Sequence, residues 1–387
     1  MAPYLGIILV AFGLLSALTS YSPLAGSIST DIGLSDVSYG LLGTIGPFTF
    51  AFMGLITPIV ARKLTLEWTI LLAAAFIGLG QILRAFAGET AGFFVFSIVA
   101  MLGIAAGNLL LPPLIKRFFP DRAVSVSTVY SMLMVTSSIY PPLLAVPIAE
   151  LVGWRFSIGV WGIIELVAVV PWLVTIFTKK KDAVAEQAPA SHKGLGRKVW
   201  SHPTSWAMLV GYAVGTFNFY IIVAWLPVML DETAGFDPAA AGALLSLYSA
   251  IGILTAFVVP NLVAKLANIG LLFIGTAAFM VAGYLGLWLA PGAATWLWVA
   301  LAGVGPTFFL ITLVATNFRT TSEIGAVTLT GMMTFGGYLI GGFGPLVVGF
   351  MRASGASWDA VIIMLIVSSL FAFAASLGLR KRRYVDE

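Results

Sequence analysis

Long apolar runs, interrupted by short polar segments, dominate this sequence of 387 residues. A helix needs about 20 apolar residues to cross the hydrocarbon core of a membrane, and each run is long enough to do so. Polar and apolar positions do not alternate within the runs, as they would in the strands of a membrane barrel. The pattern predicts twelve membrane-spanning helices, at roughly 4–30, 36–61, 66–88, 91–115, 123–150, 155–178, 204–231, 238–264, 268–290, 294–317, 323–351 and 358–379.

The composition agrees with a membrane protein and excludes two other classes. Of the residues, 60% are hydrophobic and 9% are charged, whereas about a quarter of the residues in a soluble domain carry a charge. So few charges cannot cover the surface of a soluble chain, and so apolar a chain cannot be disordered. Cysteine is absent, which excludes disulfides and thiolate metal sites.

The distribution of Lys and Arg predicts the orientation in the membrane. Seventeen of these residues fall on the side that also holds both termini, and only Arg155 and Arg352 fall on the other side. Because loops rich in Lys and Arg stay in the cytoplasm, we expect a multi-pass protein of the bacterial plasma (inner) membrane with both termini cytoplasmic. The net charge of +4 is thus a topology signal, and we expect no nucleic-acid partner.

The two halves of the chain share features at a common offset. A polar segment at 179–203 separates a first six-helix bundle at 1–178 from a second at 204–387, which includes a short basic tail. A shift of about 203 residues aligns Pro58-Ile59-Val60-Ala61-Arg62-Lys63 with Pro260-Asn261-Leu262-Val263-Ala264-Lys265, Pro142 with Pro345 and Trp154 with Trp358. Two parallel six-helix repeats joined by a cytoplasmic linker predict a secondary transporter, with its binding site between the halves.

The sequence resembles the major facilitator superfamily and, within it, the cyanate and 2-nitroimidazole transporter family. The resemblance implies an all-α integral membrane fold of twelve transmembrane helices, arranged as two pseudo-symmetric six-helix bundles with a central cavity. It spans nearly the whole chain and is carried by Leu83-Arg84, Gly107-Asn108, Pro113-Leu114-Ile115-Lys116-Arg117-Phe118, Phe219-Tyr220, Ala224-Trp225-Leu226-Pro227, Gly331-Met332, Gly337-Tyr338-Leu339-Ile340 and Gly344-Pro345.

Three segments depart from the usual patterns. Pro58 stands where the loop between spans two and three of the superfamily carries Asp, and Leu15-Ser16 replace an Arg-Pro pair in span one. Span five has Tyr140-Pro141-Pro142 in place of the antiporter glycine signature. The missing arginine argues against a cyanate-like anion, and the missing signature argues against a drug exporter.

Two charged side chains lie in the interior of predicted spans, away from the terminal residues, and a buried charge costs about 2.5 to 3.5 kcal/mol at the bilayer centre. Arg84 near the outer end of span three is either an anion-binding residue or a structural one that reaches the headgroups or pairs with Glu89. Glu165 in span six is either a proton-coupling carboxyl or a neutral, hydrogen-bonded one.

Polar residues recur at helical spacing on the spans that line the cavity in the resembled fold. Single hydroxyls in membrane helices usually bond to their own backbone, so Asn and Tyr are the stronger candidates. The predicted substrate-binding residues are Ser16, Thr19, Ser20, Arg84, Asn108, Tyr130, Asn218, Tyr220, Trp225 and Tyr338. The glycine-rich part of span eleven predicts a hinge or gate at Gly337, Gly341, Gly344 and Pro345, or tight static packing.

These observations favour a secondary active transporter that takes up a small anion, weak acid or nitroheteroaromatic by alternating access, coupled to protons. The alternatives are a proton-driven exporter of apolar drugs and a Cu(I) transporter that uses methionines such as Met132, Met134, Met332 and Met333. We expect a monomer whose partners are the solute, protons and the lipid bilayer, with no cofactor and no resident metal. No catalytic constellation or phosphate loop is present, so an enzyme is not expected.

Overall fold

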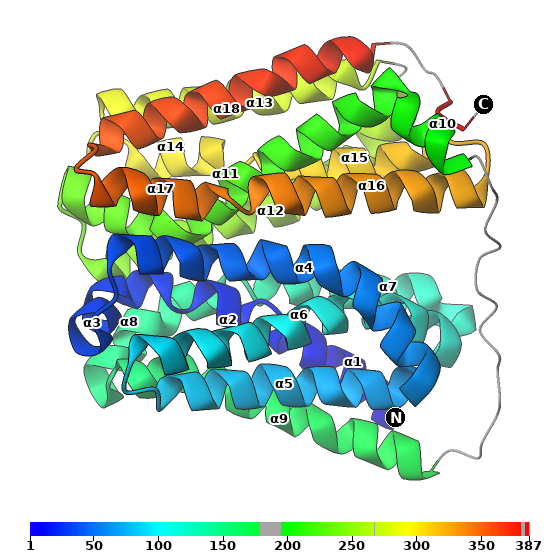
Figure 1. Cartoon of the computed structure of the whole chain (residues 1–387), viewed down its shortest axis with the longest axis horizontal. Helices are drawn as coiled ribbons and strands as arrows, with labels where there is room; N and C mark the ends of the chain where they lie inside the picture. The colour runs from blue at the N-terminus through cyan, green and yellow to red at the C-terminus, as the bar shows by residue number, and fades with distance from the viewer. Residues whose placement is uncertain (179–194, 267, 381–383, 387) are drawn as a thin grey trace.

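The computed structural model describes residues 1–178, 195–266, 268–380 and 384–386, and this part of the chain contains helices but no strand. Figure 1 shows two helical bundles side by side. The first bundle contains α1 (Ala2–Gly13), α2 (Ser16–Thr19), η1 (Ser22–Leu24), α3 (Ala25–Ile32), α4 (Asp36–Leu64), α5 (Leu66–Ala85), α6 (Thr90–Phe118), η2 (Pro120–Arg122), α7 (Ala123–Thr136), α8 (Tyr140–Val152) and α9 (Trp154–Thr178).

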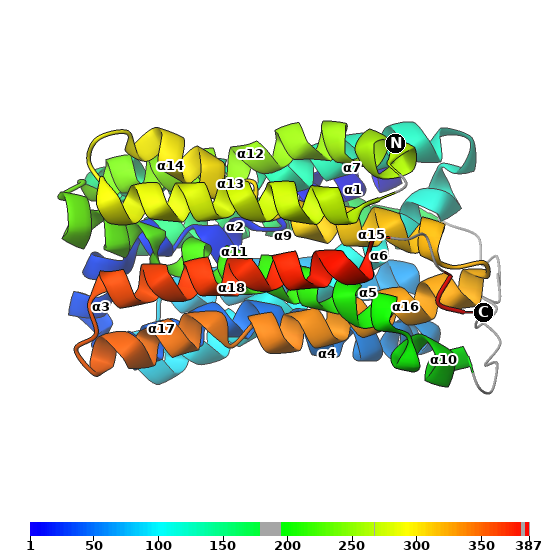
Figure 2. The same cartoon turned by 90° about the horizontal axis from the view of Figure 1, so that it is seen from above.

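The second bundle follows a short helix, α10. Figure 2, a view from above, shows its helices α13 and α18 running side by side. Its elements are α10 (Leu195–Ser201), α11 (Pro203–Ala234), α12 (Pro238–Lys265), α13 (Gly270–Leu289), α14 (Thr295–Ala302), α15 (Thr307–Arg319), α16 (Glu323–Gly341), α17 (Gly344–Ala353) and α18 (Trp358–Gly378). Most of the predicted linker 179–203 lies outside the described residues, so the predicted domain boundaries stay a prediction.

The predicted number of membrane spans agrees with the helices. Eleven helices, or runs of helices, in the described part of the chain are long and apolar enough to cross a membrane. Helices α7 and α8, bent by 42° at their junction, form the twelfth candidate. Four predicted spans are interrupted, namely the first (α1, α2, η1 and α3), the fifth (α7 and α8), the tenth (α14 and α15) and the eleventh (α16 and α17).

The two bundles meet along α4 on one side and α16 with α17 on the other. Both chain ends lie at one end of the molecule, here called the terminal end, and we call the opposite end the far end (Figure 1). Near the far end, a Cβ atom on Gly40 would lie 2.5 Å from the carbonyl oxygen of Pro345. Toward the terminal end, a Cβ atom on Gly54 or Gly331 would meet nothing within 4 Å.

A second contact between the bundles runs along α8 and α12 and opens in the same direction. At the far end, the Ser246 hydroxyl donates to the carbonyl oxygen of Ile139 (2.7 Å), and Gly242 presses against the backbone of Pro142. Gly252, further along α12, again meets nothing within 4 Å. The bundles are therefore closed against each other at the far end and parted at the terminal end.

Each bundle is tied together at the far end by an equivalent group of three side chains. An indole nitrogen and a guanidinium both donate to one carboxylate, and the guanidinium also stacks on the indole ring. The groups are Asp31, Trp154 and Arg155 in the first bundle and Glu232, Trp358 and Arg352 in the second. The carboxylates and the indoles come from equivalent spans, whereas Arg155 begins span six and Arg352 ends span eleven. The two groups contain both of the basic residues predicted on that side.

Candidate functional site

The first interruption of span one, between α1 and α2, is held open by two side chains from span five. The backbone N–H of Leu15 donates to the Ser137 hydroxyl (3.0 Å), although an unbroken helix would direct it to a carbonyl of its own chain. The Tyr140 hydroxyl donates to the carbonyl oxygen of Phe12, and the two rings stack at 4.7 Å. Side-chain groups thus replace helical hydrogen bonds, as a break inside a membrane requires.

Arg84 lies at the second interruption of the same span, between α2 and η1. Its guanidinium donates to the carbonyl oxygen of Ala17 (3.0 Å) and to the Ser20 hydroxyl (3.4 Å), and it lies over the ring of Phe93. The side chain is fully buried, so it does not reach the headgroups. Within the described residues it makes no ion pair, neither with the exposed Glu89 nor with another acid, and its Nε atom has no partner.

Glu165 is buried against the end of α1, and neither of its carboxylate oxygens has a hydrogen-bond partner in the described structure. Its Cδ and Cγ atoms lie 2.8 and 2.9 Å from the position that a Cβ atom on Gly13 would take. The ring of Tyr140 lies 5.0 Å from that of Trp161, which is one helical turn before Glu165 on α9.

Gln81 joins this group and was missed by the reasoning from sequence. It is fully buried, and its Oε1 atom lies 3.4 Å from the Ser16 hydroxyl, which itself donates to the carbonyl oxygen of Gly13 (2.6 Å). The available signal was its position three residues before Arg84, which puts both on one face of α5. The predicted residues Ser16, Ser20 and Arg84 therefore line one polar path along span one.

A group of tyrosines lies between the bundles at their centre. The Tyr130 hydroxyl donates to the side-chain oxygen of Asn108 (2.8 Å). The ring of Tyr338 stacks on Phe50 of the other bundle at 5.3 Å and lies 6.4 Å from the ring of Tyr220. Asn108 of α6 and Tyr338, near the end of α16, are only half-buried, so this centre is not fully covered by protein.

Three other predicted residues make hydrogen bonds within a helix or between helices. The Thr19 hydroxyl donates to a carbonyl of its own helix. The Asn218 amide donates to the Ser368 hydroxyl (3.0 Å) and thereby ties α11 to α18. The Trp225 indole donates to the carbonyl oxygen of Pro345 (3.1 Å). All three side chains are buried, which is typical of groups that hold helices together.

Comparison with known proteins identifies the family. The model of the Major Facilitator Superfamily matches residues 7–345. The chain belongs to this superfamily. It is 27% identical to a 2-nitroimidazole transporter of Escherichia coli, over 94% of this chain and 92% of the relative. It is 22% identical to the cyanate transport protein CynX of Escherichia coli, over 90% of this chain and 89% of the relative.

A solved structure confirms the predicted facilitator fold. A bacterial homologue of the human lysosomal transporter Spinster, in an inward-facing and unoccupied conformation, superposes with a TM-score of 0.76 at 16% identity. The match covers 99% of this chain and 98% of that one. The chain is therefore a transporter of the facilitator type and not an enzyme, as expected, and the resemblance to the 2-nitroimidazole and cyanate transporters is confirmed.

In this facilitator fold, the glycines of span eleven press against α11. A Cβ atom on Gly341 would lie 2.5 Å from that of Thr216, and one on Gly344 would lie 2.9 Å from Ile221. Gly337 packs as closely on the ring of Tyr212. The helix is interrupted between α16 and α17, just before Gly344. Span eleven thus combines close packing with an interruption. The hinge motion itself stays a prediction.

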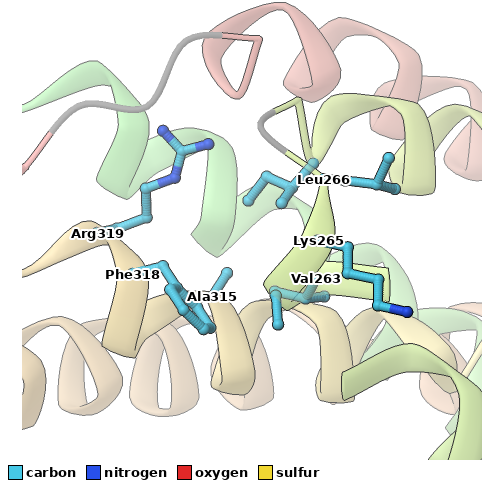
Figure 3. A pocket seen from close by; sticks show the side chains of 8 residues that line it. Val263, Lys265, Leu266, Ala315, Phe318 and Arg319 are labelled. Carbon is cyan, nitrogen blue, oxygen red and sulfur yellow. The ribbon is translucent and has the colours of Figure 1, made fainter. Parts of the chain in front are cut away.

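The pocket of the second bundle shown in Figure 3 lies away from this centre, at the terminal ends of α12 and α15. Arg319 is buried there and donates to the carbonyl oxygen of Leu379 (3.1 Å), at the end of α18. Lys265 points away from Arg319 (Figure 3). Because the C-terminal ends of helices favour cations, these two residues stabilise the helix ends, and the pocket is not a second candidate site.

The chain end docks beside this pocket, on the start of α16. The carboxylate of Asp386 accepts hydrogen bonds from the backbone N–H groups of Thr321 and Ser322 (both 2.9 Å) and from the Ser322 hydroxyl (2.7 Å). Burial by itself raises the pKa of this carboxyl, but the hydrogen bonds outweigh burial and hold the pKa below its ordinary value. The ionised tail therefore caps a helix at the interface between the bundles.

Proposed function

We propose that this facilitator takes up a small, flat solute, either a small anion or weak acid such as cyanate or a nitroheteroaromatic, by alternating access coupled to protons. The observation that carries the proposal is Arg84, a fully buried guanidinium without a carboxylate partner in the described structure. The relatives of this chain include transporters named for 2-nitroimidazole and for cyanate. Both solutes are compact, which suits a site with one cation and several ring faces.

The far end gives Arg84 a route to the solute. Tyr21 lies beside Arg84 and its buried hydroxyl has no partner. The neighbouring Tyr39 donates to the carbonyl oxygen of Ala224 in the other bundle (2.8 Å), which closes the far end. If the bundles part here, this bond breaks and Tyr21 and Arg84 lose their cover. A guanidinium then attracts an anion from that side.

The central tyrosines offer the second contact area. Once the far end closes again, a flat solute moves toward Tyr130, Tyr220 and Tyr338, where ring faces stack and neutral hydroxyls and Asn108 supply hydrogen bonds. The terminal end, open in this structure, is then the exit. With both termini in the cytoplasm of a bacterium and the chain in its plasma membrane, this order of events is uptake. The site lies within a single chain, so a monomer suffices.

Glu165 is the proposed coupling residue. An ionised carboxylate that is buried without a donor is costly, so Glu165 is neutralised while this conformation lasts. It packs on Gly13, beside an interruption of span one. A change in that interruption during transport therefore alters the surroundings of the carboxyl, and this links proton binding to the conformation.

The experiment is uptake of 2-nitroimidazole and cyanate into proteoliposomes with an imposed pH gradient. Arg84→Ala should abolish uptake of the anion and spare that of the neutral solute, because only the anion needs the guanidinium. Arg122→Gln, which removes an exposed arginine of the first bundle outside the proposed site, is the control and should transport both. Equal loss of both solutes with Arg84→Ala would contradict the anion role.

The coupling is tested in the same liposomes. Glu165→Gln should remove the pH dependence of uptake and leave solute exchange at equilibrium intact. Uptake by the wild-type protein that ignores the pH gradient would refute proton coupling, and export driven by the gradient would refute the direction.

A further inference from the structure

Several oxygen atoms lie near the end of α1, and none of them has a charged partner in the described structure. The Ser16 hydroxyl lies between the carbonyl oxygen of Gly13 (2.6 Å) and Oε1 of Gln81 (3.4 Å). The carboxylate of Glu165 lies directly against Gly13, with both oxygens unpartnered. We call these four residues the Gly13 cluster. They come from α1, α2, α5 and α9, and all are buried.

The electrostatics of the Gly13 cluster favour a cation. The C-terminal end of a helix carries partial negative charge, and α1 ends at Gly13. The carboxylate adds a full negative charge. Of the helices packed around Glu165, α8 contributes Tyr140 and α5 contributes Arg84, which lies three residues beyond Gln81 and bonds to the second interruption instead. No described lysine or arginine pairs with the carboxylate.

We propose that the Gly13 cluster binds a sodium ion. The ligands are a carboxylate, a backbone carbonyl, a hydroxyl and an amide oxygen, and such oxygens are the ligands that hard cations take. A single carboxylate balances one positive charge, so a monovalent ion fits. The tight packing of Glu165 on Gly13 favours a small ion over a large one. Interrupted membrane helices bind sodium with freed carbonyls in other transporter folds.

Sodium and the proton compete for the same carboxylate in this proposal. The sodium proposal rests on the proposed function only in taking Glu165 as the coupling residue. Sodium binding itself requires neither solute nor transport. Binding should therefore be strongest in mildly alkaline solution and weaken in mild acid, where the proton occupies Glu165.

The test is thermal unfolding of the purified full chain in detergent, in NaCl against choline chloride at equal ionic strength. Because a ligand of the folded state raises its apparent stability, the midpoint should rise with NaCl and saturate in mildly alkaline buffer, and the rise should shrink in acid. Glu165→Gln and Gln81→Leu should abolish the rise. Glu150→Gln removes an exposed carboxylate elsewhere in the first bundle and should retain it.

Direct binding of radioactive sodium to wild type and to the Glu150→Gln control covers the case in which the cluster variants fail to fold. Absence of a sodium-specific midpoint shift and of sodium binding in wild type would overturn the proposal, as would a Glu165→Gln variant that still binds the ion. Sodium binding together with uptake that ignores the pH gradient would refute proton coupling alone. Proton-driven uptake without sodium binding would refute the sodium site alone.

Discussion

The contact between Gly13 and Glu165 can be tested with one methyl group. In Gly13→Ala the new Cβ would lie 2.8 Å from Cδ and 2.9 Å from Cγ of Glu165. Both distances are shorter than carbon atoms tolerate, and the carboxylate is fully buried and has little room to retreat. Overpacking of this kind costs about 1–3 kcal/mol. Alanine regains at most about 1 kcal/mol of helix propensity, so a net loss of about 1–2 kcal/mol is expected.

The assay is thermal unfolding in detergent followed by tryptophan fluorescence, with Gly54→Ala as the matched control. Gly54 also lies inside a membrane helix, but a methyl group there meets nothing within 4 Å. The control should be neutral, or more stable by up to about 1 kcal/mol. Gly13→Ala should unfold at a clearly lower temperature than Gly54→Ala.

A double-mutant cycle connects the loss to Glu165. When Glu165 is shortened to alanine, the collision disappears, so Gly13→Ala should cost little in that background. The coupling energy between the two substitutions should reach about 1–2 kcal/mol, within the range found for residues in contact. Equal stability of Gly13→Ala and Gly54→Ala, or additive effects in the cycle, would refute the contact.

Three further predictions concern other parts of the molecule. Tyr140→Phe keeps the stacking on Phe12 but loses the hydrogen bond to the Phe12 carbonyl. The stability should therefore fall by about 0.6 kcal/mol and uptake should slow. A lower solute affinity with unchanged turnover would contradict a role in span one. A methyl group on Gly331 would meet nothing within 4 Å, and if the bundles close at the terminal end during transport, a leucine there obstructs that closure. Gly331→Leu should therefore bind solute in a thermal-shift assay without transporting it, and normal uptake would contradict this. Asp386→Asn should lower stability at neutral pH by about 1 kcal/mol. Since the pKa of Asp386 is lowered in the folded chain, its contribution is present above the ordinary value of about 3.9 and disappears as the pH falls through the lowered pKa, so variant and wild type should converge in acid.

The sequence predicted the spans well because each span is an apolar run of the required length, and the positions of its ends carry charges and turn residues. It could not show that span one is interrupted, because Leu14 and Leu15 at the first interruption are as apolar as their neighbours. The hydrogen bond from Leu15 to Ser137 joins residues far apart along the chain, and helical periodicity contains no information about such a partner.

At the candidate site, too, the sequence predicted some residues and missed others. Arg84 and Glu165 were found because a charge inside an apolar run is conspicuous, whereas Gln81 is neutral and was overlooked. Asn218 was placed with the substrate-binding residues because its large polar group needs a partner inside an apolar helix. In the structure its amide donates to Ser368 on α18, and the sequence alone does not show which distant neighbour supplies such a partner.

The interruptions of span one also bear on how the protein is made. Span one precedes the other eleven spans and contains no charge before Asp31, so it can enter the membrane as a simple apolar helix. The groups that bond to its two interruptions are Arg84 of span three and Ser137 and Tyr140 of span five. The first helix to be inserted therefore reaches its final shape only after more than a third of the chain has been synthesised. Until then span one is free to be a continuous helix. The polar path along it forms only when the side chains of spans three and five pack against it.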